Sequence, residues 1–319
     1  MELEQTIPNY NSRLGEQRFW YWRGWRVRYT YLANPTPDSS HEAPLLLLHG
    51  AGSSLEQWRE NLSAFAEQRP VYALDLLGFG GSQKVAIALN TDLWVAQVSA
   101  FAQAFLRRPM ILMGHSLGAS VALQMATSHP EQVARLVMLT LPAARQEIGG
   151  TAAKIGAVVE SWFASPLLVR PLFKLIARPQ LIRSVLKQLY QNPDRVDQAL
   201  LEGFVRPTQE RGAARTFCYL VKSRTSDSFS PMTRDLIPLV QVPALLVWGK
   251  SDRVIPISWG IYVNTLSDQL TFVAVESAGH FFYDERAADL HQLIDQWLSG
   301  QLPATNENLK SEHSAPALL

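Results

Sequence analysis

The sequence Gly114-His-Ser-Leu-Gly118 constrains the fold of this chain more than any other stretch. The apolar run Met110-Ile-Leu-Met113 before it is typical of a buried strand, and the segment 119–127 after it is typical of a helix. A serine between two glycines, at a sharp turn from strand to helix, adopts a strained backbone conformation with its hydroxyl exposed. The pattern predicts a nucleophile at Ser116, although an ordinary glycine-bounded turn that holds a serine would have the same sequence.

Short apolar segments alternate with amphipathic segments on both sides of this turn. We expect buried strands at 45–48, 71–74, 110–113, 136–139, 243–249 and 270–275, helices at 55–68, 91–107, 117–128 and 284–298, and an antiparallel hairpin at 17–32. A continuously apolar strand is covered on both faces, which is typical of a parallel sheet between two layers of helices. The predicted fold class is therefore α/β, with a mostly parallel twisted sheet.

The strand pattern stops after Pro142 and resumes at Pro243. Between them we expect helices at 151–163, 166–176, 181–190, 194–204 and 210–221, with prolines 166, 171, 179, 193 and 207 at or near helix starts. These largely apolar helices either pack only against one another and the main domain, or form a lid over an apolar substrate pocket. The predicted divisions are an N-terminal extension (1–16), a first core part (17–142), a helical cap (143–236), a second core part (237–299) and a disordered tail (300–319).

Composition and charge exclude several classes of protein. The net charge of +1 gives no electrostatic footprint for nucleic acid. The single cysteine, Cys218, excludes an internal disulfide framework. The first residues lack the features of a secretion signal, and no apolar run reaches the roughly 20 residues that span a bilayer. We therefore expect a cytoplasmic protein without a transmembrane segment; peripheral contact with a membrane and the oligomeric state stay open.

A nucleophilic serine needs a base to remove its proton and a carboxylate to orient that base. Asp252 follows the strand at 243–249, where α/β folds build their sites, and Glu147 is a weaker alternative for the acid. Of the seven histidines, His280 alone lies on a loop that leaves a strand after Asp252. The chain order Ser116, Asp252, His280 matches the order of the triad in folds with this type of turn.

Chemistry at an acyl carbon also needs hydrogen-bond donors for the developing oxyanion. The backbone N–H of Leu117, directly after the serine, is one candidate, and the N–H of Ala51 in the loop His49-Gly-Ala-Gly-Ser53 is the other. That loop lacks the pattern of a phosphate-binding loop, and the chain has no dinucleotide-binding or zinc-binding motif. We expect neither a cofactor nor a metal.

Together these motifs resemble the α/β-hydrolase superfamily, in which they occur in the same order. They are His49-Gly-Ala-Gly52, Asp75-Leu-Leu-Gly-Phe-Gly-Gly-Ser82, Gly114-His-Ser-Leu-Gly118, Gly249-Lys-Ser-Asp252 and Gly279-His280. The resemblance covers residues 17–299 and implies the α/β-hydrolase fold with a helical cap. It implies Ser116 as nucleophile, Asp252 as acid, His280 as base, and Ala51 and Leu117 as the oxyanion hole. It also implies a structural role for Asp75 and for residues 78–82.

A narrower resemblance is to the branch of photosynthetic organisms that contains chlorophyll dephytylases and pheophytinases. It lies in Trp20-Tyr-Trp-Arg-Gly-Trp-Arg-Val-Arg-Tyr29, Gln57-Trp-Arg59 and the segment 71–80. The chain departs from the plant members of that branch at His115, where they have Asn, and at Ala119, where they have Gly. This resemblance implies cleavage of a phytyl ester and a place at the edge of a photosynthetic membrane.

The sequence therefore predicts a serine hydrolase for a small-molecule carboxylic ester with a hydrophobic acyl or alcohol part. The same three side chains could also support cleavage of a C–C bond, acyl transfer or perhydrolysis, since these reactions differ in pocket shape and water access. A receptor that keeps the fold for ligand binding without catalysis is a further alternative.

Overall fold

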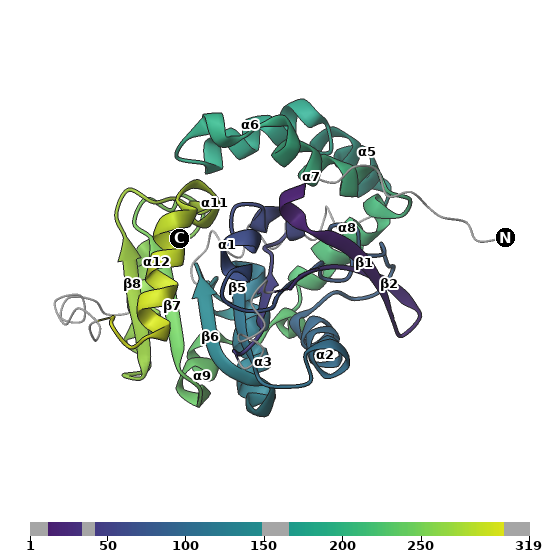
Figure 1. Cartoon of the computed structure of the whole chain (residues 1–319). Coiled ribbons are helices and arrows are strands. Elements are labelled where there is room, and N and C mark those ends of the chain that lie inside the picture. Colours follow the sequence, from purple (N-terminus) through teal and green to yellow (C-terminus); the bar gives the residue numbers. More distant parts are fainter. Residues whose placement is uncertain (1–11, 34–41, 149–165, 303–319) are drawn as a thin grey trace.

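An eight-stranded sheet forms the centre of the computed structural model, which describes residues 12–33, 42–148 and 166–302 (Figure 1). The strand order is β1-β2-β4-β3-β5-β6-β7-β8; β1 and β2 are antiparallel to their neighbours, and β3 to β8 run parallel. The strands are β1 (Glu16–Trp22), β2 (Trp25–Leu32), β3 (Leu45–Leu48), β4 (Val71–Leu74), β5 (Met110–His115), β6 (Val133–Leu139), β7 (Ala244–Gly249) and β8 (Leu270–Val275). This arrangement confirms the predicted α/β fold class.

Helices cover both faces of the sheet because successive side chains of each apolar strand point to opposite faces. Leu46 and Leu48 of β3 join the hydrophobic cluster that contains α2 (Thr91–Phe101), α3 (Leu117–Ser128) and α10 (Ile257–Asn264). Leu45 and Leu47 join the opposite cluster, which contains α1 (Leu62–Ala66) and α12 (Ala287–Leu298). All four leucines are almost fully buried.

The predicted hairpin is present, and its aromatic residues are used in packing. Arg23 and Gly24 form its turn with φ of 50° and 81°, the left-handed conformations that a two-residue hairpin turn of this kind requires. The ring of Trp20 lies 5.6 Å from that of Phe101 and 5.8 Å from that of Phe105, at the end of α2 and in the turn after it. The hairpin thus extends the hydrophobic core along one edge of the sheet.

Between β6 and β7 lie four helices that we call the cap helices. They are α5 (Pro166–Ile176), α6 (Pro179–Leu189), α7 (Gln198–Gln209) and α8 (Ala213–Arg224). In Figure 1, α5, α6 and α7 arch over one end of the sheet, at the top of the view, while α2, α3 and α9 (Thr233–Leu236) lie towards the bottom. The predicted helix at 151–163 lies outside the described residues, as does most of the predicted tail.

The prolines of this region do not all mark helix starts. Pro171 lies inside α5 and Pro207 inside α7, so the prediction is wrong for both residues. A proline inside a helix removes one backbone hydrogen bond. Phe173 and Val205, close to these two prolines, are buried. Tertiary packing of such side chains can override the local preference against proline.

Three predicted helices of the core also differ from the structure. The segment 55–68 forms a 3₁₀ turn, η3 (Leu55–Trp58), and the short α1, because Arg59 and Asn61 between them bond to Asp284 and to the carbonyl of Tyr283. The segment 91–107 changes from α2 to a π turn, η4 (Ala102–Leu106). The segment 284–298 divides into α11 (Phe282–Glu285) and α12, and α10 was not predicted at all.

The other short helical turns are η1 (Ser12–Leu14), η5 (Pro130–Gln132), η6 (Arg145–Glu147), η7 (Pro193–Arg195), η8 (Asp227–Phe229) and η9 (Ile237–Leu239).

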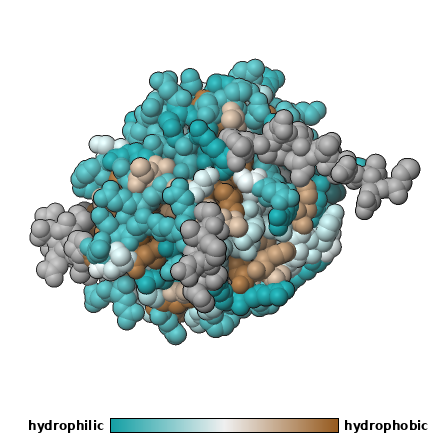
Figure 2. All heavy atoms as spheres, in the orientation of Figure 1, coloured by the Kyte–Doolittle hydropathy of each residue, from teal (hydrophilic) through white to brown (hydrophobic). Residues whose placement is uncertain are grey.

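The surface of the described part of the chain is mixed. On the coloured parts of the face in Figure 2, hydrophilic residues predominate and hydrophobic residues show as separate patches. Within the described ranges, no helix combines the length and the hydropathy that a membrane span requires.

Candidate active site

The turn at Ser116 has the sharp geometry that its sequence predicts. Ser116 connects β5 to α3 with φ of 51° and ψ of −118°, an unfavourable conformation for a residue with a side chain. A Cβ atom on Gly114 would lie 2.1 Å from the carbonyl oxygen of Gly118, and one on Gly118 would lie 2.4 Å from the carbonyl oxygen of Leu48. Glycine is therefore required at both positions for strand and helix to pack this closely.

His280 and Asp252 form a hydrogen-bonded pair at the same edge of the sheet. Asp252 follows β7, and His280 follows β8. Nδ1 of His280 lies 2.8 Å from Oδ2 of Asp252, and the side chains are 6% and 0% exposed. The other carboxylate oxygen of Asp252 accepts the backbone N–H groups of Val254 and Ile255 at 2.7 and 2.9 Å. An acceptor at Nδ1 favours the tautomer with its proton on Nδ1, so that Nε2 is free to accept a proton.

The loop after β3 lies directly against the serine turn. A Cβ atom on Gly50 would be 2.9 Å from Nδ1 of His115 and 3.4 Å from Cβ of Ser116. Ala51, the next residue of that loop, and Leu117, the first residue of α3, line one cavity together with Ser116 and His280. The structure thus brings four of the five predicted site residues to one cavity, with Asp252 hydrogen-bonded behind His280.

That cavity, which we call the catalytic cavity, has a volume of about 520 Å³. A second, mainly apolar cavity of about 530 Å³ lies against the cap helices and has Phe173, Ile182, Leu186 and Phe217 in its wall. The two cavities share several wall residues. These are Ala51, Leu189, Leu220, Arg224 and Phe281. The apolar cavity therefore adjoins the catalytic cavity, with these residues between the two.

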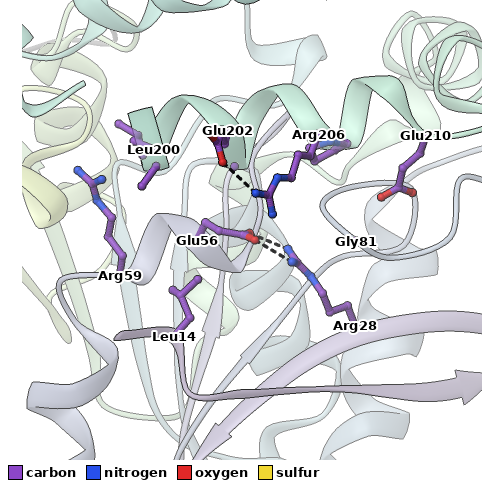
Figure 3. Close-up of a pocket in the computed structure, with 12 residues that line it drawn as sticks. Leu14, Arg28, Glu56, Arg59, Gly81, Leu200, Glu202, Arg206 and Glu210 are labelled. Atoms are coloured by element: carbon purple, nitrogen blue, oxygen red, sulfur yellow. Dashed lines mark hydrogen bonds and ion pairs between the residues drawn. The ribbon is translucent and has the colours of Figure 1, made fainter. Parts of the chain in front are cut away.

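A third, smaller cavity of about 240 Å³ lies between α7 and the core and is lined by charged residues (Figure 3). Arg28 forms a bidentate pair with Glu56, at 2.6 and 2.7 Å, and a further ion pair with Asp75. Arg206 pairs with Glu202 within α7, at 2.8 Å. These cations are paired with carboxylates of the protein, so the cavity shows the features of a packed polar interface between cap and core.

The catalytic cavity is not lined by Glu147, Cys218 or Asp75. The carboxylate of Glu147 accepts the backbone N–H groups of Ala144, Thr233 and Arg234, which ties η6 to α9. Cys218 is buried. Asp75 is fully buried, and its carboxylate accepts the N–H groups of Leu55 and Gly81, both at 2.7 Å.

Two buried histidines near the site have a pKa below the usual value of histidine. Nδ1 of His49 lies 2.7 Å from the carbonyl of Gly50, and its Nε2 accepts the N–H of Leu76 at 3.1 Å. Burial lowers the pKa of His49. Burial also lowers the pKa of His115 well below the usual range of histidine, and the positive charge of a protonated His280 acts in the same direction.

His115 and Gln57 also line the catalytic cavity, and the sequence reasoning gave neither a role. His115 is part of the serine motif itself, which was a signal that could have been followed. Gln57 lies in the segment 57–59 that carries the narrower resemblance, but nothing in its local pattern separates it from a surface glutamine of a helix.

Comparison with known proteins places these features in a family. The sequence profile of the alpha/beta hydrolase family matches residues 45–293. An uncharacterized hydrolase, YugF, from Bacillus subtilis is 23% identical over 270 residues, which are 82% of this chain and 90% of that protein. The 2-hydroxymuconate semialdehyde hydrolase of Pseudomonas sp. (strain CF600) is 26% identical over 275 residues, 82% of this chain and 89% of that protein.

A solved structure supports the same fold. The crystal structure of a membrane phospholipase A, described as a bacterial virulence factor, superposes with a TM-score of 0.71 at 24% identity. The match covers 91% of this chain and 87% of that one. At this level of identity the likeness shows the fold alone.

Proposed function

Because this chain belongs to the alpha/beta hydrolase family, we propose that it is a serine hydrolase that cleaves a carboxylic ester with a hydrophobic acyl or alcohol part. The observation that carries the proposal is the arrangement at the catalytic cavity. Ser116 and His280 line the same cavity, and Asp252 holds His280 by a hydrogen bond of 2.8 Å.

In the proposed mechanism, Nε2 of His280 removes the proton of Ser116 as its hydroxyl oxygen attacks the ester carbonyl. The backbone N–H groups of Ala51 and Leu117 donate to the negative oxygen of the tetrahedral intermediate. His280 then gives its proton to the leaving alcohol, and Asp252 stabilises the protonated imidazole in the meantime. A water molecule, activated by the same histidine, releases the acid from Ser116.

The preference for a hydrophobic substrate follows from the apolar cavity. Its wall includes Ile176, Ile182, Leu186 and Phe217, and it adjoins the catalytic cavity, with which it shares wall residues. A chain that enters this space leaves water and gains contact with apolar side chains, at about 0.8 kcal/mol for each buried CH₂ group. A long acyl or alcohol chain is therefore favoured over a sugar or a peptide.

The finer proposal is that the alcohol part is phytol and that the substrate is a chlorophyll-type pigment. An enzyme with that substrate would work at the surface of a photosynthetic membrane without spanning it. The aromatic segment that resembles the dephytylase branch packs on α2 through Trp20 and Tyr29. This packing gives the segment a structural use, so the apolar cavity is what supports the substrate.

A second candidate function is hydrolysis of a C–C bond in a dienoic ring-fission product. It is favoured by the similarity to the 2-hydroxymuconate semialdehyde hydrolase, which extends over 82% of the chain. The same serine, histidine and aspartate would take part. Acyl transfer and perhydrolysis by the same three side chains are further alternatives, and ligand binding without turnover is an outcome that the same experiment separates.

The experiment is a panel of substrates offered to the purified protein, with Ser116→Ala as the control. The panel contains p-nitrophenyl esters from acetate to palmitate, chlorophyll a and a 2-hydroxy-6-oxo-dienoate. Turnover beyond one equivalent that rises with chain length and is lost in the variant supports the esterase. Release of chlorophyllide supports dephytylation. Turnover of the dienoate alone moves the assignment to C–C hydrolysis, and no turnover of any substrate contradicts the proposal.

A further inference from the structure

His115, the residue directly before the proposed nucleophile, has hydrogen-bond partners at both ring nitrogens although it is only 1% exposed. Its Nε2 lies 3.0 Å from the carbonyl oxygen of His280. A carbonyl can only accept, so Nε2 carries the proton. In the neutral ring Nδ1 is then an acceptor, and the hydroxyl of Tyr283 lies 3.3 Å from it and Nε2 of Gln57 3.5 Å.

Gln57 is equally buried, and its amide group is oriented by the backbone. Its Oε1 accepts the N–H of Gly50 at 3.0 Å, so its NH₂ group points towards Nδ1 of His115. Gln57 belongs to η3, which follows the Gly50 loop. The side chain thus connects that loop to the serine turn.

These contacts form one buried chain of hydrogen bonds through three loops. It runs from the N–H of Gly50, in the loop of the proposed oxyanion donor, through Gln57 to His115 in the serine turn, and ends at the carbonyl of His280. The rings of His115 and His280 are also in edge contact, with centroids 4.6 Å apart. Each of the three loops contributes at least one functional group to the proposed mechanism.

The proposed function leaves these two side chains without a role, and packing alone does not explain their polarity. An apolar residue of similar size at 57 or 115 would leave the buried Gly50 N–H or the His280 carbonyl without its partner. Buried polar groups without partners are costly, so such a network is kept where it holds groups in a required arrangement.

We propose that Gln57 and His115 are positioning residues that hold the oxyanion loop and the loop of the catalytic base in register with Ser116. The proposal rests on the serine hydrolase function proposed above. Neither residue needs to touch the substrate's reacting atoms. Their effect reaches the reaction through Ala51, which follows Gly50, and through the backbone of His280.

The charge state of His115 is part of the proposed arrangement. Tyr283 and the neighbouring histidines His280 and His49 are the titratable groups that face its ring, and none of them is an anion at neutral pH. Burial keeps the pKa of His115 low, so it stays neutral when His280 gains the proton of Ser116. A second positive charge in contact with His280 would oppose that proton transfer.

The test compares variants that remove different parts of the network. His115→Leu removes both ring nitrogens, whereas His115→Gln places an amide NH₂ group near the position of Nε2 and can still donate to the His280 carbonyl. Gln57→Met keeps the length of the side chain without its polar atoms. We expect His115→Leu and Gln57→Met to lower kcat about 10- to 100-fold with KM changed less than about threefold, because misplaced groups affect mainly the transition state. We expect His115→Gln to recover most of the activity.

The matched control is His129→Leu, which removes a histidine at the end of α3 opposite to Ser116, where it pairs with Glu131 at 3.6 Å. We expect this variant to leave kcat unchanged. The double variant Gln57→Met/His115→Leu should be little worse than either single variant, because the two residues act in one network.

The rate at which a fluorophosphonate labels Ser116 serves as a second readout, since it needs the nucleophile, base and oxyanion donors but no particular ester. If wild type is labelled and no ester is turned over, the ester assignment fails, and the labelling rates of the variants still test the network. If wild type is not labelled at Ser116, both proposals fail. Three results would each overturn the positioning role. The folded His115→Leu variant could keep its kcat and its labelling rate within threefold of wild type, or its loss could be confined to KM. The His115→Gln variant could also be as slow as His115→Leu.

Discussion

The carboxyl edge of the sheet and the cap helices hold their side chains in different ways. At the sheet edge, each proposed catalytic group follows a strand end and is fixed by backbone contacts, as Asp252 is by the N–H groups of Val254 and Ile255. The cap instead presents the apolar side chains of amphipathic helices, and exposes Leu175, Leu181 and Val185 by 39 to 46%. Under the proposed function, backbone geometry at the sheet edge would set the chemistry, whereas the more freely exchangeable side chains of the cap would set the choice of substrate.

Polar contacts join the cap to the core at several points, such as Thr216 to Val85 and Lys84 to Glu210, and one group of them centres on two core residues. Arg59 pairs with Asp197 before α7 at 2.8 Å and with Asp284 of α11 at 2.9 Å. The hydroxyl of Tyr190, at the end of α6, donates to Asp284 at 3.0 Å. If the two regions differ as described, substitutions at the sheet edge should abolish all turnover, and substitutions in the cap should change which ester is preferred.

The largest expected effect is the loss of the nucleophile or the base. Ser116→Ala and His280→Ala should each lower kcat about 10⁴- to 10⁶-fold for every ester in the panel. The double variant should be little worse than either single variant, because the groups act as a unit. Steady-state kinetics with the unfolding midpoint as a control would check this. Near wild-type activity in both single variants would show that the assignment is wrong.

Asp252→Asn tests the orientation of the base. The amide of this variant would place either an NH₂ group or a weaker acceptor against Nδ1 of His280. An NH₂ group there favours the tautomer with its proton on Nε2, which cannot accept the proton of Ser116. We expect kcat to fall about 10⁴-fold with the fold intact. Circular dichroism and kcat measured on the same preparation separate the two effects. A variant that fails to fold would mark Asp252 as a structural residue instead.

The junction of cap and core should show an effect on stability. Asp284 is fully buried. Its removal leaves the guanidinium of Arg59, which is 5% exposed, with only part of the negative charge that balances it. Asp284→Ala should lower the free energy of unfolding by about 3–5 kcal/mol. The control is Asp289→Ala, which breaks an exposed ion pair with Arg286 in the same part of the chain and should cost less than about 1 kcal/mol. Chemical denaturation of both variants measures the difference, and equal losses would contradict the special role of the junction.

The sequence predicted the core well because its signals are local. Glycine is required on both sides of Ser116, because a Cβ atom there would lie 2.1 or 2.4 Å from a backbone oxygen. The parallel strands must be apolar because they are buried on both faces, so both patterns are visible in the sequence. The break between η3 and α1 was missed because it depends on Arg59 and Asn61, whose partners lie more than 200 residues away. Gln57 was missed for the same reason, since its role depends on contacts between loops.

A substitution in the wall of the apolar cavity should change substrate preference without affecting the chemistry. Ile182→Trp would fill part of the cavity between the cap helices. We expect kcat/KM for long p-nitrophenyl esters to fall about 10- to 100-fold, with the acetate ester changed less than about threefold. Leu175→Trp, at a cap position 46% exposed, is the matched control. Equal losses for short and long esters would show that the chain does not occupy this cavity.

The smallest expected effect is on stability in acid, and it arises from a buried histidine of the core. Burial lowers the pKa of His49 in the folded chain, whereas an unfolded histidine titrates near pH 6.5. Below about pH 6.5 the unfolded state therefore binds a proton that the folded state does not, and the free energy of unfolding falls as the pH falls.

His49→Gln keeps an acceptor for the N–H of Leu76 and removes this titration. Below pH 6.5, its free energy of unfolding should fall less steeply than that of wild type, by up to about 1.4 kcal/mol per pH unit. Urea unfolding between pH 4.5 and 7.5 measures the slopes, with His129→Gln as a control at a side chain 37% exposed. Equal slopes in wild type and His49→Gln would show that His49 takes up its proton in the folded core as it does in the unfolded chain. The hydrogen bonds of His49 with Gly50 and Leu76, behind the loop of Ala51, would then need a different assignment.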